Sequence, residues 1–242
     1  MAIIELIHPL AFVALLTAGL VRGLTGFGVG LLLAPALSII YDASTAVVTV
    51  QLVDLPSSLY LLAINWRYAD IRSIGAMGAG GIVGAPLGAQ VLTSIDPIIM
   101  RKLIGFLALA FTAILASGFR FRARASLHTA TAVGVVAGCL GATSALPGPP
   151  AILYFLSGPY QLTEARANII VFLITIQCIL ICTFLWHDLI TKELLLRSLG
   201  LAPIYFVAIW IGNHLFGLVN ETWFRRISLL IIAATALGAI FY

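Results

Sequence analysis

Long apolar stretches fill almost the whole of this chain, and charged residues interrupt them only at intervals. Only 9% of the 242 residues are charged, whereas a soluble domain carries about a quarter charged residues. The chain therefore cannot cover a water-facing surface. A membrane-spanning helix needs about 20 mostly apolar residues, and charges gather where it leaves the hydrocarbon. Divided at its charges, the chain gives ten apolar segments, over residues 3–24, 25–41, 44–65, 73–93, 102–118, 126–146, 147–158, 163–186, 194–219 and 227–242.

These segments predict an all-α integral membrane protein, because lipid excludes open sheet. The N-terminus lacks the basic region and cleavage site of a removable signal peptide, so the first segment is expected to stay in the bilayer. The net charge of +4 is scattered along the chain, which argues against a nucleic-acid partner. Enzyme motifs such as Gly-x-Ser-x-Gly are absent, and the three cysteines have no metal-ligand neighbours. We therefore expect a bilayer protein that is not an enzyme and holds no metal or cofactor.

Two boundaries between segments contain no polar linker. Residues 3–41 as one helix would be about 58 Å long, nearly twice the hydrocarbon thickness, so the helix must break. Glycines supply the break between residues 22 and 30, and glycines and prolines supply the other between residues 138 and 150. The short segments that follow, 25–41 and 147–158, either span the bilayer or re-enter it, which gives 8 to 10 crossings.

The two breaks lie at matching positions of an internal repeat. Gly23, Gly26 and Pro35 align with Gly138, Gly141 and Pro150 at a constant offset of 115 residues. The chain is thus predicted to contain two transmembrane repeats of five segments, 1–125 and 126–242, joined by a linker over 119–125. Duplication with interrupted helices at matching positions is typical of secondary transporters, whose binding site forms where the broken helices meet. We therefore expect the two breaks to face each other near mid-membrane.

The distribution of Lys and Arg indicates the orientation of the repeats. If all ten segments span, nine basic residues lie on one side and four on the other. The termini are then outside and the repeats are inverted, which is the arrangement we expect. If the short segments re-enter instead, the split becomes six against seven, the repeats become parallel, and the rule gives no orientation.

The first glycine run, Gly26-x-Gly28-x-Gly30, has two interpretations. No strand precedes it, so it is not a nucleotide-binding loop. It either frees backbone N–H groups that face an anion, together with a helix beginning near Leu31, or it lets two helices pack closely. The second glycine run, Gly80-x-x-x-Gly84-x-x-x-Gly88, places small residues on one helix face and predicts close helix packing.

Few polar residues lie inside the apolar segments, and these are the remaining site candidates. Asp54, with Gln51 one turn earlier, is an intramembrane acid and a candidate coupling group. Its alternatives are a structural partner for an arginine or a carboxyl kept neutral. Arg166 begins the eighth segment and is the expected anion anchor, since a guanidinium binds an oxyanion through two hydrogen bonds. For either arginine the alternative is a side chain that only extends to the membrane interface. Arg22 is the weaker candidate because it is expected nearer the membrane surface.

Several motifs also resemble the TauE/SafE family of sulfite and organosulfonate exporters. In the first half these are Arg22-Gly-Leu-Thr-Gly-Phe-Gly-Val-Gly, Asn65-Trp-Arg and Gly84-Ala-Pro-Leu-Gly88; in the second half they are Gly148-Pro-Pro-Ala-Ile-Leu-Tyr154 and Arg166-Ala. Many members repeat a Gly-x-Gly-Gly type of run in the second half, where this chain has Ala-Thr-Ser-Ala after Gly141. The Thr143 and Ser144 hydroxyls are candidates to replace the missing backbone donors.

The resemblance implies a carrier of small sulfur-containing anions in the inner, cytoplasmic membrane. Sulfite, thiosulfate and two- or three-carbon organosulfonates are the candidate substrates, with transport coupled to protons or run by the anion gradient. The expected substrate-binding residues in the second break are Gly148, Pro149 and Pro150, with a helix starting near Ala151. The alternative function is a channel-like or scaffolding membrane protein without substrate turnover. The expected partners are the small anion and the lipid bilayer; a homodimer is left open, and the sequence does not give the oligomeric state.

Overall fold

The computed structural model describes residues 9–25, 28–117, 126–215 and 221–241. Within these ranges the chain is helical and contains no strand, which confirms the all-α prediction. The helices are α1 (Pro9–Thr25), α2 (Val29–Ile40), α3 (Ala43–Asn65), η1 (Trp66–Tyr68), α4 (Ile71–Ser94), α5 (Pro97–Ala116), α6 (Leu127–Ser144), α7 (Gly148–Ser157), α8 (Leu162–Trp186), α9 (Lys192–Leu215) and α10 (Glu221–Phe241). The predicted linker over 119–125 lies outside the described residues.

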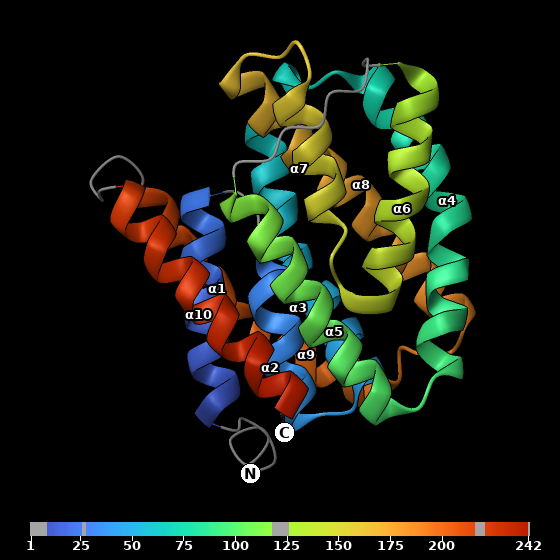
Figure 1. Ribbon diagram of the computed structural model, residues 1–242, viewed down its shortest axis with the longest axis vertical. Coiled ribbons are helices and arrows are strands. Elements are labelled where there is room, and N and C mark those ends of the chain that lie inside the picture. Colours follow the sequence, from blue (N-terminus) through green and yellow to red (C-terminus); the bar gives the residue numbers. More distant parts are fainter. Residues whose placement is uncertain (1–8, 26–27, 118–125, 216–220, 242) are drawn as a thin grey trace.

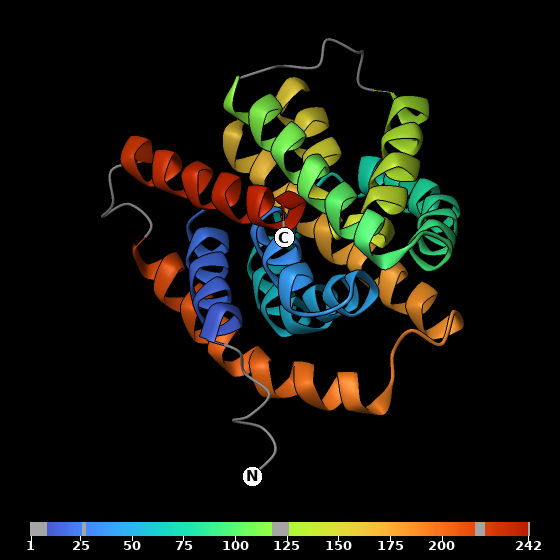
Figure 2. The same ribbon diagram turned by 60° about the horizontal axis from the view of Figure 1, so that its bottom comes forward.

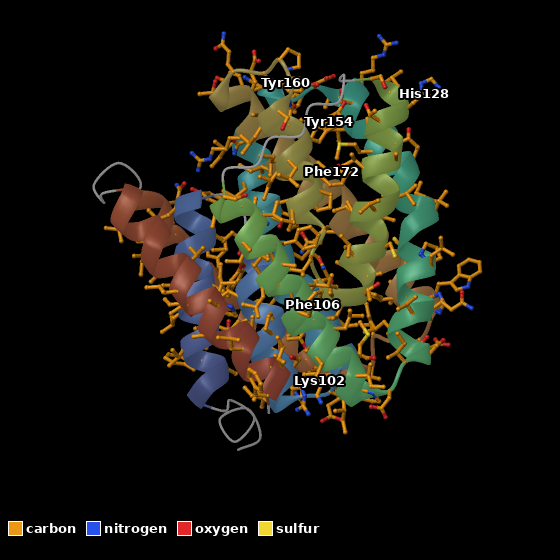
Figure 3. All side chains as sticks on the ribbon, in the orientation of Figure 1. Lys102, Phe106, His128, Tyr154, Tyr160 and Phe172 are labelled. Carbon is orange, nitrogen blue, oxygen red and sulfur yellow. The ribbon has the colours of Figure 1, made fainter. Side chains whose placement is uncertain are left out.

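The outer surface of the helix bundle is apolar. Among the described residues, α3, α4, α5, α6, α8 and α9 are long and apolar enough to cross a membrane. Large apolar side chains such as Ile82 and Val83 on α4 and Phe106 on α5 are exposed, and Phe106 is labelled in Figure 3. Only lipid can solvate so much exposed apolar surface. The chain is a multi-pass membrane protein.

Two helices begin earlier than their charges predict. The α5 helix starts at Pro97 rather than at residue 102, because the Asp96 carboxylate accepts hydrogen bonds from the N–H groups of Ile98 and Ile99 at 2.9 and 3.3 Å. An N-cap of this kind outweighs the charges of the first turns. The α10 helix likewise begins at Glu221 instead of residue 227. Basic residues near these ends lie inside the helices, so charge positions marked the boundaries only approximately.

The short segments after the breaks form short helices. At 12 and 10 residues, α2 and α7 are about 18 and 15 Å long, roughly half of the hydrocarbon thickness. Each reverses the direction of the helix before it (Figure 1). The start of α1 and the end of α2 lie at the bottom of the view. The start of α6 and the end of α7 lie at the top. In Figure 3, His128 at the start of α6 and Tyr160 after α7 mark that top end.

Helices from the two halves of the sequence pack directly on one another. The α1 helix packs along α9 and α4 packs along α6, pairs that lie side by side in Figure 2. The α3 helix also contacts α9, and α4 also contacts α8. Two further contacts join α3 to α8 and α5 to α10. Every helix pair in this set therefore joins a segment from before residue 118 to one from after residue 126.

Glycines bring α4 and α6 into backbone contact. A Cβ on Gly80 or Gly84 would overlap with the backbone oxygen of Thr131 or Val135, respectively. From the other side, a Cβ on Gly134 would overlap with the backbone of Met77. The packing interpretation of this glycine run is thus confirmed. Small residues allow such close approach in lipid, where the hydrophobic effect does not press helices together.

We predict that Gly84→Ala lowers the melting temperature of the detergent-solubilised protein by several degrees. The new methyl group must push α6 away, and such overpacking costs about 1–3 kcal/mol. Gly75→Ala is the matched control, because Gly75 lies in the same helix with no atom within 4 Å of its Cβ position. Its melting temperature should stay equal to or above that of the wild type. Equal melting of the two variants would contradict close packing at Gly84.

Candidate functional site

The first break lies between α1 and α2 and depends on Gly28. This residue has φ 97° and ψ 0°, a left-handed conformation that side-chain-bearing residues rarely adopt. The α2 helix then begins at Val29, two residues before the predicted start near Leu31. The N–H groups of its first turn have no partners within the helix. Gly26 of the predicted site lies outside the described residues.

The second break lies between α6 and α7 and has a strained residue at its centre. The α6 helix ends at Ser144, and Ala145 then adopts φ 56° and ψ 29°. The N–H groups of Ala145 and Leu146 donate to the carbonyls of Gly141 and Leu140 at 3.0 and 3.3 Å, which closes the helix end. The α7 helix begins at Gly148, three residues before the predicted start. Left-handed strain in a non-glycine residue is often found at functional sites.

The two breaks face each other, as their matching positions predict. A Cβ on Gly30 would overlap with the backbone oxygen of Ala145, so α2 begins directly against the second break. A cavity of about 30 Å³ lies where they meet. Since one water needs roughly 10–15 Å³, this volume holds about two waters. The cavity is lined by Arg22, Gly28, Val29, Gly30, Leu31, Gln51, Asp54, Ala145, Leu146, Pro147, Gly148, Pro149, Ile152, Leu173 and Gln177.

A buried ion pair forms the charged part of this cavity. Arg22 Nε from α1 lies 2.7 Å from Asp54 Oδ1 of α3, and the two side chains are 3% and 6% exposed. The Nε–H forms no aligned hydrogen bond, so this contact rests on charge. Arg22 Nη2 instead donates to Ser58 Oγ at 2.7 Å. The two opposite charges sum to zero, and each buried ion has the other as its counter-ion.

Three further side chains donate hydrogen bonds around the Asp54 carboxylate. The Ser58 hydroxyl donates to Oδ2 at 2.9 Å from one turn further along α3. The Tyr205 hydroxyl of α9 donates to Oδ1 at 3.0 Å. Gln177 Nε2 of α8 lies 3.5 Å from Oδ2 and donates to the backbone oxygen of Gln51 at 2.7 Å. Helices α1, α3, α8 and α9 therefore meet at this single carboxylate.

The structure gives each of the three charged candidates a different position. Asp54, the candidate coupling group, is paired with Arg22, which is the arginine partner of its alternative interpretation. Arg22 was expected near the membrane surface, yet its side chain is 3% exposed and lines the cavity. Arg166, the expected anchor, is only half-buried in the first turns of α8 and does not line the cavity. The local sequence gave no indication of which arginine points inward.

The remaining predicted residues divide between the cavity and its surroundings. Gly28, Gly30, Gln51, Gly148 and Pro149 line the cavity, whereas Pro150 does not. Thr143 and Ser144 are buried away from it. Their hydroxyls donate to the carbonyls of Cys139 and Leu140 in their own helix, at 2.6 and 2.8 Å. The Thr143 hydroxyl also lies 3.4 Å from the backbone oxygen of Gly88 in α4. These hydroxyls therefore bond to nearby backbone carbonyls and do not face the cavity.

Sequence reasoning missed Ser58, Gln177 and Tyr205. Gln177 had a usable signal, because an amide inside an apolar helix is costly and marks a functional candidate. Ser58 lies one helical turn from Asp54, which is also a detectable spacing. Tyr205 had no such signal, since its contact with Asp54 joins residues 151 positions apart.

A second polar cluster lies at the end of the molecule where α3 and α7 end. The Tyr160 hydroxyl and Ser73 Oγ donate to Asp70 Oδ2 at 2.9 and 2.6 Å, and the Asp70 N–H donates to Asn168 Oδ1 at 2.6 Å. Partial burial acts to raise the pKa of Asp70, but hydrogen bonds from the Ser73 and Tyr160 hydroxyls and from the backbone N–H groups of Ser73 and Arg72 outweigh it and leave the pKa lowered. The cluster ties the turn before α4 to the turn before α8.

The sequence matches the family described as sulfite exporter TauE/SafE over residues 10–239. The chain belongs to the TauE/SafE family. Comparison with curated proteins and with solved structures finds no match. Because TauE/SafE proteins are membrane transporters and not enzymes, the cavity of this TauE/SafE protein is a transport site candidate rather than an active site.

We predict that breaking the Arg22–Asp54 pair strongly destabilises this TauE/SafE protein. Asp54→Asn leaves a buried guanidinium without its counter-ion, and losing one partner of a buried pair costs about 3–5 kcal/mol. The double variant Arg22→Met with Asp54→Asn should melt above Asp54→Asn, because it removes the unpaired charge. Thermal melting in detergent measures both effects.

Glu193→Gln provides the matched control for this carboxyl-to-amide change. Glu193 pairs with Arg197 at 3.5 Å, but its side chain is 79% exposed. An exposed pair contributes about 0–1 kcal/mol. If Glu193→Gln lowers the melting temperature as much as Asp54→Asn does, breaking the buried pair costs no more than breaking an exposed pair, and the prediction is wrong.

Proposed function

We propose that this chain is a secondary transporter that moves a small sulfur-containing anion across the inner, cytoplasmic membrane. Sulfite, thiosulfate and two- or three-carbon organosulfonates are the candidate substrates. The observation that carries the proposal is the placement of a buried guanidinium, Arg22, in a cavity between two helix breaks. A fixed cation in low-dielectric surroundings attracts an anion far more strongly than one in water.

The start of α2 supplies the second part of the proposed anion site. Val29, Gly30 and Leu31 line the cavity at the beginning of the helix, where N–H groups and the positive dipole end are free to face an anion. An anion between Arg22 and this helix end replaces its hydration shell with fixed donors. Both elements belong to the first half of the chain.

Asp54 supplies the proposed coupling to protons. An anion that binds Arg22 must compete with the Asp54 carboxylate, which already neutralises that guanidinium. Protonation of Asp54 removes the competing charge and frees Arg22, so a proton and an anion bind together. The hydrogen bond from Tyr205 and the contact with Gln177 hold the carboxyl in place in either state.

Inverted repeats fit the way in which the helices pair. If 1–125 and 126–242 are equivalent units, α1 corresponds to α6 and α4 to α9, so the α1–α9 pair corresponds to the α4–α6 pair. The α3–α9 and α4–α8 contacts correspond in the same way. The hairpins α1–α2 and α6–α7 also enter from opposite ends of the molecule (Figure 1). These features support alternating access about a central site.

The alternative, a scaffold or channel-like protein, has less support. A scaffold needs neither interrupted helices nor a buried ion pair at their meeting point, and both are costly to build. The two interruptions are found in the structure at Gly28 and at Ala145. A continuous water-filled pore would also require more than the roughly two waters that the cavity holds.

We predict substrate-specific transport in proteoliposomes that contain the purified protein. Sulfite, thiosulfate, taurine, sulfoacetate and sulfolactate form the test panel, and at least one should show saturable exchange. Arg22→Lys should weaken that exchange about tenfold or more, because a hydrogen bond with a charged group contributes about 1.5–3 kcal/mol. Arg166→Lys is the matched control and should change it little. If Arg166→Lys abolishes exchange and Arg22→Lys does not, the anion site lies elsewhere.

We predict that Asp54 causes the pH dependence of anion binding. Methanesulfonate is a suitable competitor of exchange, since its own charge is constant across the pH range. In the wild type its inhibition constant should rise as pH increases, because the anion is proposed to bind together with a proton. In Asp54→Asn the constant should be independent of pH. If the inhibition constant of Asp54→Asn changes with pH as steeply as that of the wild type, the coupling group is a residue other than Asp54.

A further inference from the structure

Gln177 has a buried hydrogen-bond acceptor that no group in the described structure satisfies. The side chain lines the cavity and is 2% exposed. Its Nε2 donates to the backbone oxygen of Gln51 at 2.7 Å and lies 3.5 Å from Asp54 Oδ2. Its Oε1 is buried and has no hydrogen-bond partner. Native proteins rarely leave such an acceptor unpaired, so this oxygen requires an explanation.

The orientation of the Gln177 amide follows from its neighbours. A flipped amide would place Oε1 against the backbone oxygen of Gln51, and two acceptors cannot form a hydrogen bond. The same flip would bring Oε1 towards the Asp54 carboxylate and add a repulsive contact. Gln51 and Asp54 therefore fix the amide with its nitrogen bound and its oxygen free. A ligand in the cavity meets an acceptor on this side.

This acceptor discriminates between anions by whether they carry a donor of their own. A ligand with an O–H group can donate to Oε1 and pair it. A ligand with only acceptor oxygens leaves Oε1 unpaired and in electrostatic conflict with the negative ligand. Sites that hydrogen-bond a substrate hydroxyl reject analogues without it far more strongly than apolar pockets reject a size change.

The charges around the cavity limit the ligand in a second way. Among the residues that the structure describes, Arg22 of α1 and Asp54 of α3 are the ionisable groups that line it, and Tyr205 of α9 contacts Asp54 from outside the cavity. When Asp54 is protonated, a monovalent anion makes the charge of the site zero. A divalent anion leaves one uncompensated negative charge in low-dielectric surroundings, which is strongly unfavourable. The small volume of the cavity also favours a small ligand.

We propose that the bound species is a monovalent oxyanion with its own O–H group, hydrogen sulfite rather than the sulfite dianion, and that Gln177 selects it. This inference rests on the proposed function and specifies the substrate of the same site. Arg22 binds the negative oxygens, and Gln177 Oε1 accepts the ligand O–H. Gln177 is thus a specificity-determining residue.

Methanesulfinate provides the decisive test, because a methyl group replaces the hydroxyl of hydrogen sulfite while shape and single charge are retained. Labelled sulfite exchange is measured in proteoliposomes at a mildly acidic pH where dissolved sulfite is almost entirely hydrogen sulfite. Unlabelled sulfite and methanesulfinate then compete with the label. In the wild type we expect methanesulfinate to compete at least about tenfold more weakly. Equal competition in a preparation that exchanges sulfite would overturn the inference and leave the proposed function intact.

Two variants test whether Gln177 is the source of this discrimination. Gln177→Leu removes the acceptor at similar volume and should reduce the preference to less than about threefold, mainly by weakening sulfite binding. Thr49→Val is the matched control, because Thr49 is a fully buried residue with an unpaired hydroxyl that does not line the cavity. It should keep the wild-type preference, and an unchanged preference in an active Gln177→Leu variant would refute the role of Gln177. Exchange of another anion of the panel but not of sulfite by well-inserted wild-type protein would also overturn the inference. Exchange of no anion of the panel would instead reject the proposed function itself.

Discussion

The ion pair between Arg22 and Asp54 is the interaction on which the arrangement of the central helices depends. Neither ion is stable alone in surroundings of low dielectric constant, so α1 and α3 must stay in contact. The carboxylate also binds Tyr205 of α9 and lies near Gln177 of α8, which extends the same requirement to the second half of the chain. The Asp54 carboxylate therefore connects the first helix break to Gln177 and Tyr205, which lie 123 and 151 residues further along the chain.

Close backbone packing around this centre compensates for the two interrupted helices. A break removes helical hydrogen bonds, and lipid offers no replacement for them. The glycines of α4 bring its backbone against α6, and Gly23 does the same for α1 against Ile209 of α9. These close contacts hold α1 and α6, the helices that end at the breaks. Each interruption is thus supported by a continuous neighbouring helix.

Features set by local sequence were predicted, and features set by tertiary contact were not. The segments, the two breaks and the glycine packing follow from apolar runs and from Gly and Pro, which act locally. The start of α5 was predicted too late, at residue 102, because the segment was divided at its charges. The N-cap at Asp96 begins the helix ahead of those charges. Arg22 rather than the preferred Arg166 lines the cavity, since helix rotation decides which side chain points inward. Tyr205 could not be found because its role depends on a partner in another helix.

The two helix starts at the cavity differ chemically, although each follows one of the two breaks. Val29, Gly30 and Leu31 all retain their N–H groups, so the start of α2 offers a full set of donors. At the start of α7, Pro149 and Pro150 follow Gly148 and have no N–H, which removes donors from its first turn. An anion between the two starts therefore finds Arg22 and most backbone donors on one side and a largely apolar wall on the other. This asymmetry suits a ligand whose charged oxygens face one way, and it lets the site distinguish the two ends of a small molecule.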